Sequence, residues 1–396
     1  MNDFDIDGIT GDPDRRIIVC CGSGGVGKTS TAAAVALNAA ERHGRRVVVM
    51  TIDPAKRLAQ ALGLNELGNE PHRIEGLRDG SLDAMMLDMK QTFDQVVNEQ
   101  AEPEKARSIL ANPFYQALST TFSGTQEYMA MERLSRLRAE DRWDLIVVDT
   151  PPSRSALDFL DAPARLARLM DGPMIRMLAA SVPGRPRRSV LSLMGTSAAV
   201  MTRVFNKVLG GHLLTDIAEF TAGLQDTFGG FRERADRTFS VLRSPETAFL
   251  VVAIPDEPAV AEAVYFSRRL KSERLPVAGL VLNQCEPLLA CLSADRASAA
   301  AEVLEAVNPG AGAAGVLEVH AQMARRRSTQ EHIAARFSAA FPEIPVREVP
   351  LRGVEIADLD GLREFFTPLH SPMTDMSSDT FTLVGHCPHK KTHYHR

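Results

Sequence analysis

Residues 17–30 have the sequence IIVCCGSGGVGKTS, and this stretch decides the fold of the chain. Its first five residues form a continuous apolar run, which is typical of a buried parallel strand. The eight residues from Gly22 to Thr29 match the pattern G-x-x-x-x-G-K-[ST], whose glycines let backbone N–H groups converge on phosphate oxygens. A helix is predicted to start near Thr29, and its dipole would add positive potential at the loop. A strand and a helix on either side make a chance glycine-rich turn a poor alternative.

This loop predicts a site for the phosphates of ATP together with magnesium. Lys28 can reach the β- and γ-phosphates, and the Thr29 hydroxyl can bind Mg²⁺. The residues expected to contact the nucleotide here are Gly22, Ser23, Gly24, Gly25, Val26, Gly27, Lys28, Thr29 and Ser30.

Further apolar runs bounded by turn residues alternate with helical patterns along the chain, as in a doubly wound, mostly parallel α/β sheet. The predicted strands are Ile17–Cys21, Val47–Ile52, Leu145–Asp149, Phe249–Ile254, Val277–Asn283 and the weaker Val346–Val349. Two acidic residues, Asp53 and Asp149, stand at the carboxyl ends of neighbouring predicted strands, where open α/β sheets bind ligands. Such carboxylates can hold magnesium or orient an attacking water, although either could be a simple strand-end or helix-capping Asp.

Length and composition describe a globular protein. The 396 residues are 44% hydrophobic and 24% charged, with a formal net charge of −5, which argues against a general nucleic-acid binder. The N-terminus is acidic and lacks the order of a signal peptide. The longest central uncharged stretch, Ser189–Thr202, is shorter than the roughly 20 residues of a membrane-spanning helix. We expect a cytoplasmic protein without an integral membrane segment.

Methionine is concentrated in a region that we expect to be mainly helical. Ten of the fifteen methionines lie between Met85 and Met201. We predict a helical subdomain inserted within about residues 88–247, around the strand at 145–149. These methionines either fill a core or line a groove for varied apolar partners. The expected boundaries are a disordered N-terminus over 1–15, one domain over 16–366 and a disordered tail over 367–396.

Several segments resemble the ArsA-type ATPases, a family that includes the arsenite-pump ATPase and the guided-entry ATPase for tail-anchored membrane proteins. They are GSGGVGKTST at the loop, TIDPAKRLAQALG from Thr51, GTQEYMAMERL from Gly124, DLIVVDTPPSRSALDFLDAP from Asp144, VLNQ from Val281 and VPLRGVEI from Val349. The resemblance covers roughly residues 16–366 and is closest to a bacterial member with a single phosphate loop.

The resemblance implies roles for particular residues. Asp53 would position the attacking water, and Asp149 would begin the second of two nucleotide-sensing switches. Magnesium would be organised by Thr29 with Asp53 and Asp149. The adenine would contact Asn283 and the segment that starts with Pro350 and Leu351.

One departure from the family concerns catalysis. The family usually has a lysine early in the loop that reaches the partner's nucleotide across a dimer, and Ser23 occupies that place here. By analogy with arginine fingers, loss of such a cation could lower the rate of ATP hydrolysis by roughly 10³–10⁵-fold. Either Lys56 or Arg57 supplies the missing charge, or the chain pairs with a paralogue that retains the lysine.

A second departure concerns metals. The Cys-x-x-Cys that clamps the tail-anchor-targeting dimer through zinc is missing, since Cys285 and Cys291 are six positions apart with Pro287 between them. We interpret them as ordinary thiols. The tail gathers His386, Cys387, His389, His393 and His395, which could bind metal but are more simply a solvated tail.

These observations favour a slow, magnesium-dependent ATPase that acts as a dimeric switch. ATP hydrolysis would be coupled to binding and release of a hydrophobic helix client, and peripheral membrane association is left open. The alternative is a nucleotide-locked scaffold that hydrolyses poorly and pairs with a lysine-bearing paralogue. A small-substrate P-loop enzyme is a third, weaker reading.

Overall fold

The structure is a computed structural model that describes residues 4–53, 55–112, 115–116, 125–151, 239–288, 290–310, 312–353 and 356–368. Most of the predicted helical insertion, including Ser189–Thr202, and almost all of the predicted tail lie outside these residues.

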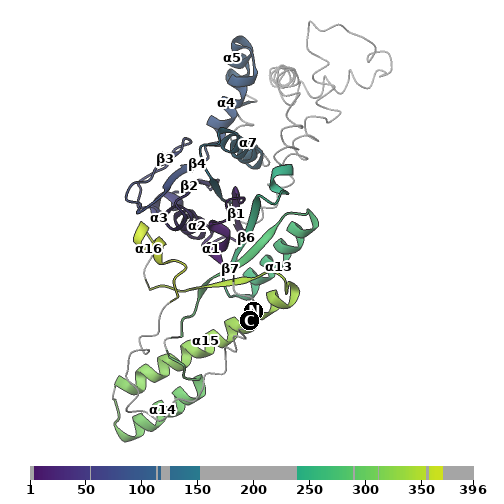
Figure 1. The fold of residues 1–396 in the computed structure, drawn as a ribbon. Helices are drawn as coiled ribbons and strands as arrows, with labels where there is room; N and C mark the ends of the chain where they lie inside the picture. Colours follow the sequence, from purple (N-terminus) through teal and green to yellow (C-terminus); the bar gives the residue numbers. More distant parts are fainter. Residues whose placement is uncertain are drawn as a thin grey trace, which may run out of the picture.

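An eight-stranded sheet lies at the centre of the described chain (Figure 1). Its order is β3-β4-β2-β5-β1-β6-β7-β8, and every neighbouring pair is parallel except β3 with β4. The strands are β1 (Ile17–Gly22), β2 (Arg46–Thr51), β3 (His72–Arg73), β4 (Ser81–Met86), β5 (Leu145–Asp149), β6 (Thr247–Ala253), β7 (Val277–Cys285) and β8 (Val346–Pro350).

The predicted fold class is confirmed, and all six predicted strands are present as β1, β2, β5, β6, β7 and β8. Strands β3 and β4 were not predicted from the sequence. Strand β4 contains Asp83, a charged residue in the middle of an otherwise apolar run, and Met85 and Met86 belong to this strand. The buried Asp83 carboxylate accepts a hydrogen bond from Trp143 Nε1 at 2.7 Å and pairs with Arg73 Nε at 2.7 Å. These partners let a carboxylate occupy a buried strand.

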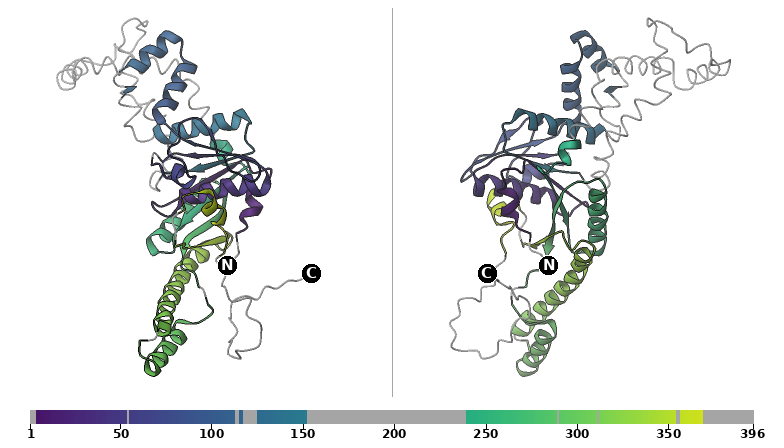
Figure 2. Two further views of the ribbon diagram at one scale, coloured as in Figure 1. Left: turned by 90° about the vertical axis from the view of Figure 1, so that its left-hand side faces the viewer. Right: turned by 45° about the vertical axis from the view of Figure 1, so that its right-hand side comes forward.

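Helices cover the sheet on both faces (Figure 2). Helix α2 packs on β1, β2 and β5, whereas α13 packs on β6, β1 and β7. From β1 the chain moves toward one edge of the sheet and from β6 toward the other, so right-handed crossovers place α2 and α13 on opposite faces. The main helices are α2 (Lys28–His43), α3 (Arg57–Ala61), α4 (Met89–Gln100), α5 (Pro103–Ala111), α7 (Thr125–Glu140), α13 (Glu257–Ser272), α14 (Ala294–Val307), α15 (Gly312–Ala340) and α16 (Leu359–Glu364).

The N-terminal segment differs from the expected disorder over residues 1–15. Residues Ile6–Thr10 form helix α1, which packs on α2. Phe4 is buried and its ring lies against Gly279, where a Cβ would meet it at 2.6 Å. The acidic composition of this segment suggested disorder, but the buried side chains of Phe4 and Ile6 hold it against the rest of the domain.

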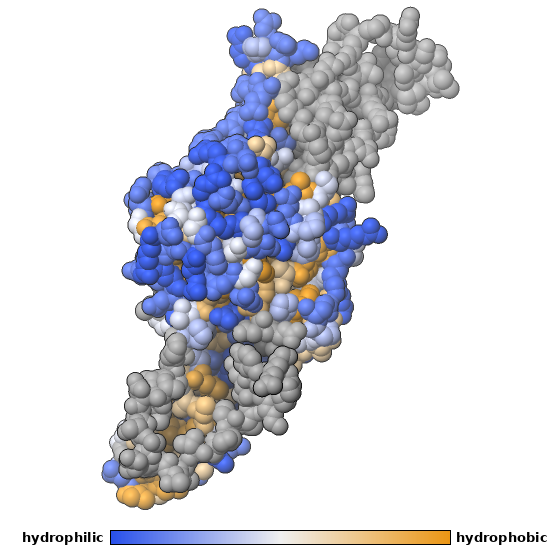
Figure 3. Space-filling model, in the orientation of Figure 1, coloured by the Kyte–Doolittle hydropathy of each residue, from blue (hydrophilic) through white to orange (hydrophobic). Residues whose placement is uncertain are grey.

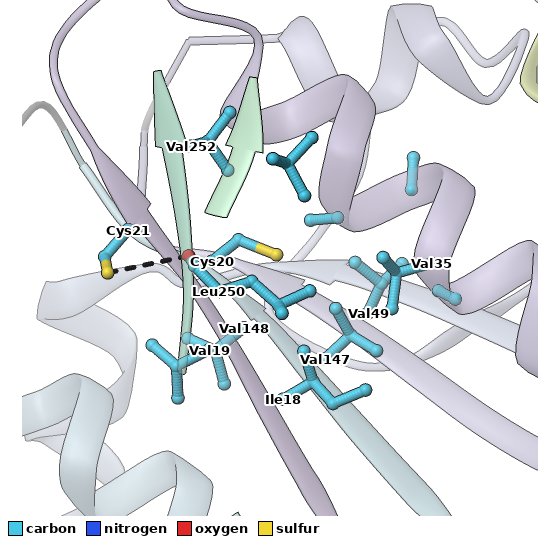
Figure 4. Close-up of a cluster of buried hydrophobic side chains, with 14 of the residues drawn as sticks. Ile18, Val19, Cys20, Cys21, Val35, Val49, Val147, Val148, Leu250 and Val252 are labelled. Atoms are coloured by element: carbon cyan, nitrogen blue, oxygen red, sulfur yellow. Dashed lines mark hydrogen bonds between the residues drawn. The ribbon is translucent and has the colours of Figure 1, made fainter. Parts of the chain in front are cut away.

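The core is built from the continuous apolar strands and an alanine-rich face of α2. Figure 4 shows Ile18, Val49 and Val147 from three neighbouring strands packed beside Val35 of α2. Cys20 and Cys21 are buried here, as predicted for small apolar residues. The Cys21 thiol lies 3.6 Å from the Leu250 carbonyl oxygen, and burial raises its pKa to about 12. These thiols are therefore packing groups and are not reactive thiolates.

Helices α14 and α15 pair as a hairpin that extends away from the sheet (Figures 1 and 2). Four valines near its tip are exposed, namely Val303, Val307, Val316 and Val319. The corresponding end of the molecule is coloured as hydrophobic in Figure 3. Even so, none of the helices in the described ranges has the length and apolar character needed to cross a membrane.

Candidate nucleotide-binding site

The loop between β1 and α2 has a backbone that requires glycine. Gly22 has a φ of 152°, and a Cβ there would lie 2.0 Å from the Val252 carbonyl oxygen. Gly27 has a φ of 90°, and a Cβ there would lie 2.2 Å from Asn283 Nδ2. Both positions combine left-handed backbone with a close neighbour, so the loop keeps its open shape only with glycine.

Lys28, the first residue of α2, crosses back over this loop. Its Nζ donates a hydrogen bond to the Ser23 carbonyl oxygen at 2.7 Å. Burial lowers the pKa of Lys28, and the nearby Asp149 carboxylate opposes this shift. The ammonium group therefore lies within the loop, where a phosphate oxygen could replace the Ser23 carbonyl oxygen as its hydrogen-bond acceptor.

Asp149 lies behind the loop with one oxygen engaged. Its Oδ2 accepts hydrogen bonds from Thr29 Oγ1 at 2.8 Å and from Thr51 Oγ1 at 2.9 Å. Its Oδ1 is buried and makes no hydrogen bond. Burial raises the pKa of Asp149 to about 6, although both hydroxyls favour the charged form. A buried carboxylate with an unused oxygen beside a hydroxyl is a suitable receptor for a hydrated divalent cation.

Asp53 lies just beyond the end of β2. Its Oδ1 accepts a hydrogen bond from the Ala55 backbone N–H at 3.0 Å, and its Oδ2 lies 3.5 Å from Arg57 Nη1. The Asp53 side chain is 16% exposed, so the carboxylate is held in place yet reachable by water.

Ser23, at the position of the family lysine, makes contact within its own chain. Its hydroxyl donates to Glu262 Oε2 of α13 at 2.5 Å. The side chain is therefore neutral and directed at a neighbouring helix of the same molecule.

Asn283 joins the end of β7 to the loop. Its Nδ2 donates to the Val26 carbonyl oxygen at 2.9 Å, and the residue is buried. The next residue, Gln284, has a φ of 59°, and the pairing register of β7 with β8 shifts between Leu282 and Cys285. This irregularity turns the chain so that both Asn283 and Gln284 border the same cavity.

These elements surround a cavity of about 350 Å³. Of the residues expected to contact the nucleotide or magnesium, nine line it: Gly25, Gly27, Lys28, Thr29, Ser30, Asp53, Asn283, Pro350 and Leu351. Gly22, Ser23, Gly24, Val26 and Asp149 are not among its lining residues, because Asp149 lies behind Thr29 and the Ser23 side chain faces α13. The volume lies within the usual range of small-molecule sites.

Other lining residues were not identified from the sequence as nucleotide contacts, although Arg57 was one of two candidates for the missing charge. They are Arg57, Gln60, Ala61, Thr150, Gln284, Val349, Arg352, Ile356 and Phe365. The spacing of Arg57, Gln60 and Ala61 puts them on one face of α3, and this spacing was a usable signal. No sequence signal marks Ile356 and Phe365 as lining residues, because only the path of the chain after β8 brings them to the cavity.

The two cysteines near β7 differ in environment. Cys285 is buried, its thiol donates to the Leu282 carbonyl oxygen at 3.2 Å, and burial raises its pKa to about 12. Cys291 is exposed. Within the described part of the chain, no group of three or more His, Cys, Asp or Glu side chains is arranged to hold a metal ion.

A parallel sheet with a phosphate loop after its first central strand, and acidic residues after two neighbouring strands, defines a P-loop nucleotide-binding protein of the doubly wound class. The sequence profile of the anion-transporting ATPases, the ArsA ATPase family, matches residues 15–296. The chain belongs to this family, which confirms the resemblance found in its sequence.

Individual relatives are distant. The chain is 27% identical to the ATPase GET3 of Malassezia globosa over 222 residues, which are 53% of this chain and 61% of that protein. It is 26% identical to the ATPase GET3B of Arabidopsis thaliana over 288 residues, or 69% and 65% of the two chains. It is 30% identical to the putative arsenical pump-driving ATPase of Chlorobaculum tepidum over 155 residues, which are 38% of this chain and 36% of that protein. The chain thus spans less than two thirds of the length of each of these three relatives.

Proposed function

We propose that this chain binds ATP with magnesium in the cavity described above and hydrolyses it slowly to ADP and phosphate. The observation that carries the proposal is the joint lining of one cavity by Lys28, Thr29, Asp53 and Asn283, which come from three separate parts of the chain. Membership of an ATPase family supports the same activity.

Each part of the cavity has a role in this reaction. The loop and Lys28 bind the β- and γ-phosphates, where Lys28 would exchange the Ser23 carbonyl oxygen for phosphate oxygens. Asp53 accepts a hydrogen bond from the attacking water and orients it toward the γ-phosphorus. The apolar residues Val349, Leu351 and Phe365 offer a surface for the base.

The donor set fits magnesium. Thr29 would contact the ion, whereas the unused Oδ1 of Asp149, together with Asp53, would accept from its coordinated waters. A bound Mg²⁺ ion neutralises charge on the β- and γ-phosphate oxygens.

We further propose that two chains form a cytoplasmic, nucleotide-dependent dimer that binds and releases a hydrophobic helix client. The segments Asp53–Leu58 and Asp149–Leu157 would sense the γ-phosphate and transmit its presence to the Met-rich helical region. Support comes from the resemblance to the guided-entry ATPase and from the methionine content of residues 85–201.

A second candidate is a nucleotide-locked scaffold that pairs with a lysine-bearing paralogue. The hydrogen bond from Ser23 to Glu262 favours it, because that loop position then offers no cation to a partner's nucleotide.

The test is magnesium-dependent ATP turnover by the purified chain, with particle mass determined in the ATP- and ADP-bound states. We expect turnover that Lys28→Ala and Asp53→Asn both abolish, and a mass that doubles with ATP. Tight ATP binding without turnover would favour the scaffold instead. Failure to bind ATP would overturn both functions.

A further inference from the structure

The phosphate end of the cavity needs positive charge beyond Lys28. During hydrolysis the water oxygen bonds to the γ-phosphorus, the bond to the β,γ-bridging oxygen breaks, and ADP leaves. Charge on the equatorial and bridging oxygens must be neutralised as this happens. The proton that the water gives up passes by way of Asp53 to the released phosphate. The loop itself contributes Lys28 alone, since Ser23 is neutral and bonded to Glu262.

Two neighbouring cations at the start of α3 could supply this charge, and their surroundings differ. Lys56 lies 3.8 Å from Glu66, with its side chain 63% exposed, and it does not line the cavity. Arg57 lines the cavity together with Gln60 and Ala61, one turn further along the same helix face. A third cation at the cavity, Arg352, donates to the carbonyl oxygens of Glu364 and Thr367 and is held there.

Arg57 is held only loosely. Its contact with Asp53 is 3.5 Å long and its side chain is 58% exposed, so the pair is a weak one. A nucleotide phosphate is a stronger and bidentate acceptor for a guanidinium group. Arg57 and Lys28 also line the same cavity. The two cations therefore act on the same small volume.

We propose that Arg57 is a catalytic arginine that acts within its own chain: it leaves Asp53 when ATP binds and pairs with the γ-phosphate as the bond to ADP breaks. This inference rests on the proposed ATPase function and identifies the residue that replaces the family lysine. The exchange has a second effect, because releasing Arg57 frees the Asp53 oxygen to receive the attacking water.

The experiment compares Arg57→Ala, Arg57→Lys and the matched control Arg336→Ala, whose side chain on α15 is 62% exposed and lies 3.3 Å from Glu257. Steady-state kcat and KM for ATP are measured together with the affinity for ADP in the presence and absence of aluminium fluoride, a mimic of the transferred phosphoryl group. For Arg57→Ala we expect kcat to fall at least ~100-fold. We also expect the gain in ADP affinity from aluminium fluoride to vanish, with the affinity for ADP alone changed less than about threefold.

Arg57→Lys should recover part of both losses, and Arg336→Ala should match the wild type. An Arg57→Ala enzyme with wild-type kcat and the full fluoride effect would overturn the proposal. If the wild type binds ATP but does not turn it over, the proposed hydrolysis fails, while the fluoride measurement still decides the role of Arg57. A wild type without any fluoride effect would also overturn that role.

Discussion

The amide group of Asn283 offers a nitrogen donor and an oxygen acceptor. Its Nδ2 donates to the Val26 carbonyl oxygen and thereby ties β7 to the phosphate loop. Asn283 also lines the cavity, and under the proposed function its amide oxygen accepts a hydrogen bond from the exocyclic amino group of adenine. Guanine presents an acceptor at the equivalent place and would be repelled.

We therefore expect the wild type to bind ATP at least ~10-fold more tightly than GTP, since leaving a buried polar group unpaired costs roughly 1–3 kcal/mol. Asn283→Ala should weaken ATP binding and bring the two affinities close together. Fluorescence titration with labelled ATP and GTP measures both. A variant that keeps the wild-type preference would show that the base is read elsewhere.

Under the proposed function, the buried carboxyl of Asp149 should make magnesium binding dependent on pH. Its pKa is raised to about 6 in the free chain, and a bound cation would lower it. Binding must then release a proton whenever the pH is below about 6, whereas at pH 7 and above the carboxylate is already charged. The affinity for Mg·ATP is thus expected to be constant above pH 7 and to fall as the pH drops through 6.

This expectation is measured by calorimetric titration of Mg·ATP between pH 5 and pH 8 in buffers of different ionisation enthalpy. Proton release should appear below pH 6 in the wild type. Asp149→Asn cannot release a proton at this position and should show weak, pH-independent binding. Equal affinity of the wild type at pH 5 and pH 8 would contradict the role given to Asp149.

At the scale of secondary-structure elements, the apolar strands were predictable and the polar exceptions were not. Strands β1, β2, β5, β6 and β7 are built on continuous apolar runs, so the pattern alone reveals them, whereas β8 contains Arg347 and Glu348 and was predicted only weakly. Strand β4 was missed because Asp83 interrupts its pattern, and its partners Trp143 and Arg73 are distant in sequence. The loop, Asp53 and Asn283 follow from local motifs, whereas Ile356 and Phe365 reach the cavity only through tertiary structure.

The buried contact between Trp143 and Asp83 gives a prediction for stability. Trp143→Phe keeps the apolar ring but removes the donor to a carboxylate that is 3% exposed. We expect the free energy of unfolding to fall by about 1–3 kcal/mol. Urea denaturation followed by circular dichroism measures it, because Trp143 is the only tryptophan.

Tyr265→Phe is the matched control, since Tyr265 is 62% exposed on α13. It should stay within about 0.5 kcal/mol of the wild type. A Trp143→Phe variant as stable as this control would mean that the contact adds nothing to the sheet.

At the scale of the whole molecule, the site is a meeting point of distant segments. The cavity takes residues from the ends of β1, β2, β5, β7 and β8 and from the segment around α16. A ligand that contacts all of them stabilises the folded sheet as a unit.

A non-hydrolysable ATP analogue with magnesium at 100 times its dissociation constant should therefore stabilise the chain by about 2.7 kcal/mol. We expect a rise of several degrees in the melting temperature in differential scanning calorimetry. Lys28→Ala should lose most of this rise. A wild-type melting temperature that does not change with the analogue would show that the cavity binds no nucleotide.

The spread of the cavity along the chain also governs when a newly made molecule can first become active. A ribosome delivers β1 and the phosphate loop long before Pro350, Leu351 and Phe365, which follow much later in the sequence. Until then the loop lacks the strand and the apolar wall that complete its pocket. A nascent chain that lacks β8 and the segment after it thus cannot hold nucleotide in the complete pocket, so the ligand stabilises only chains in which these parts have been synthesised.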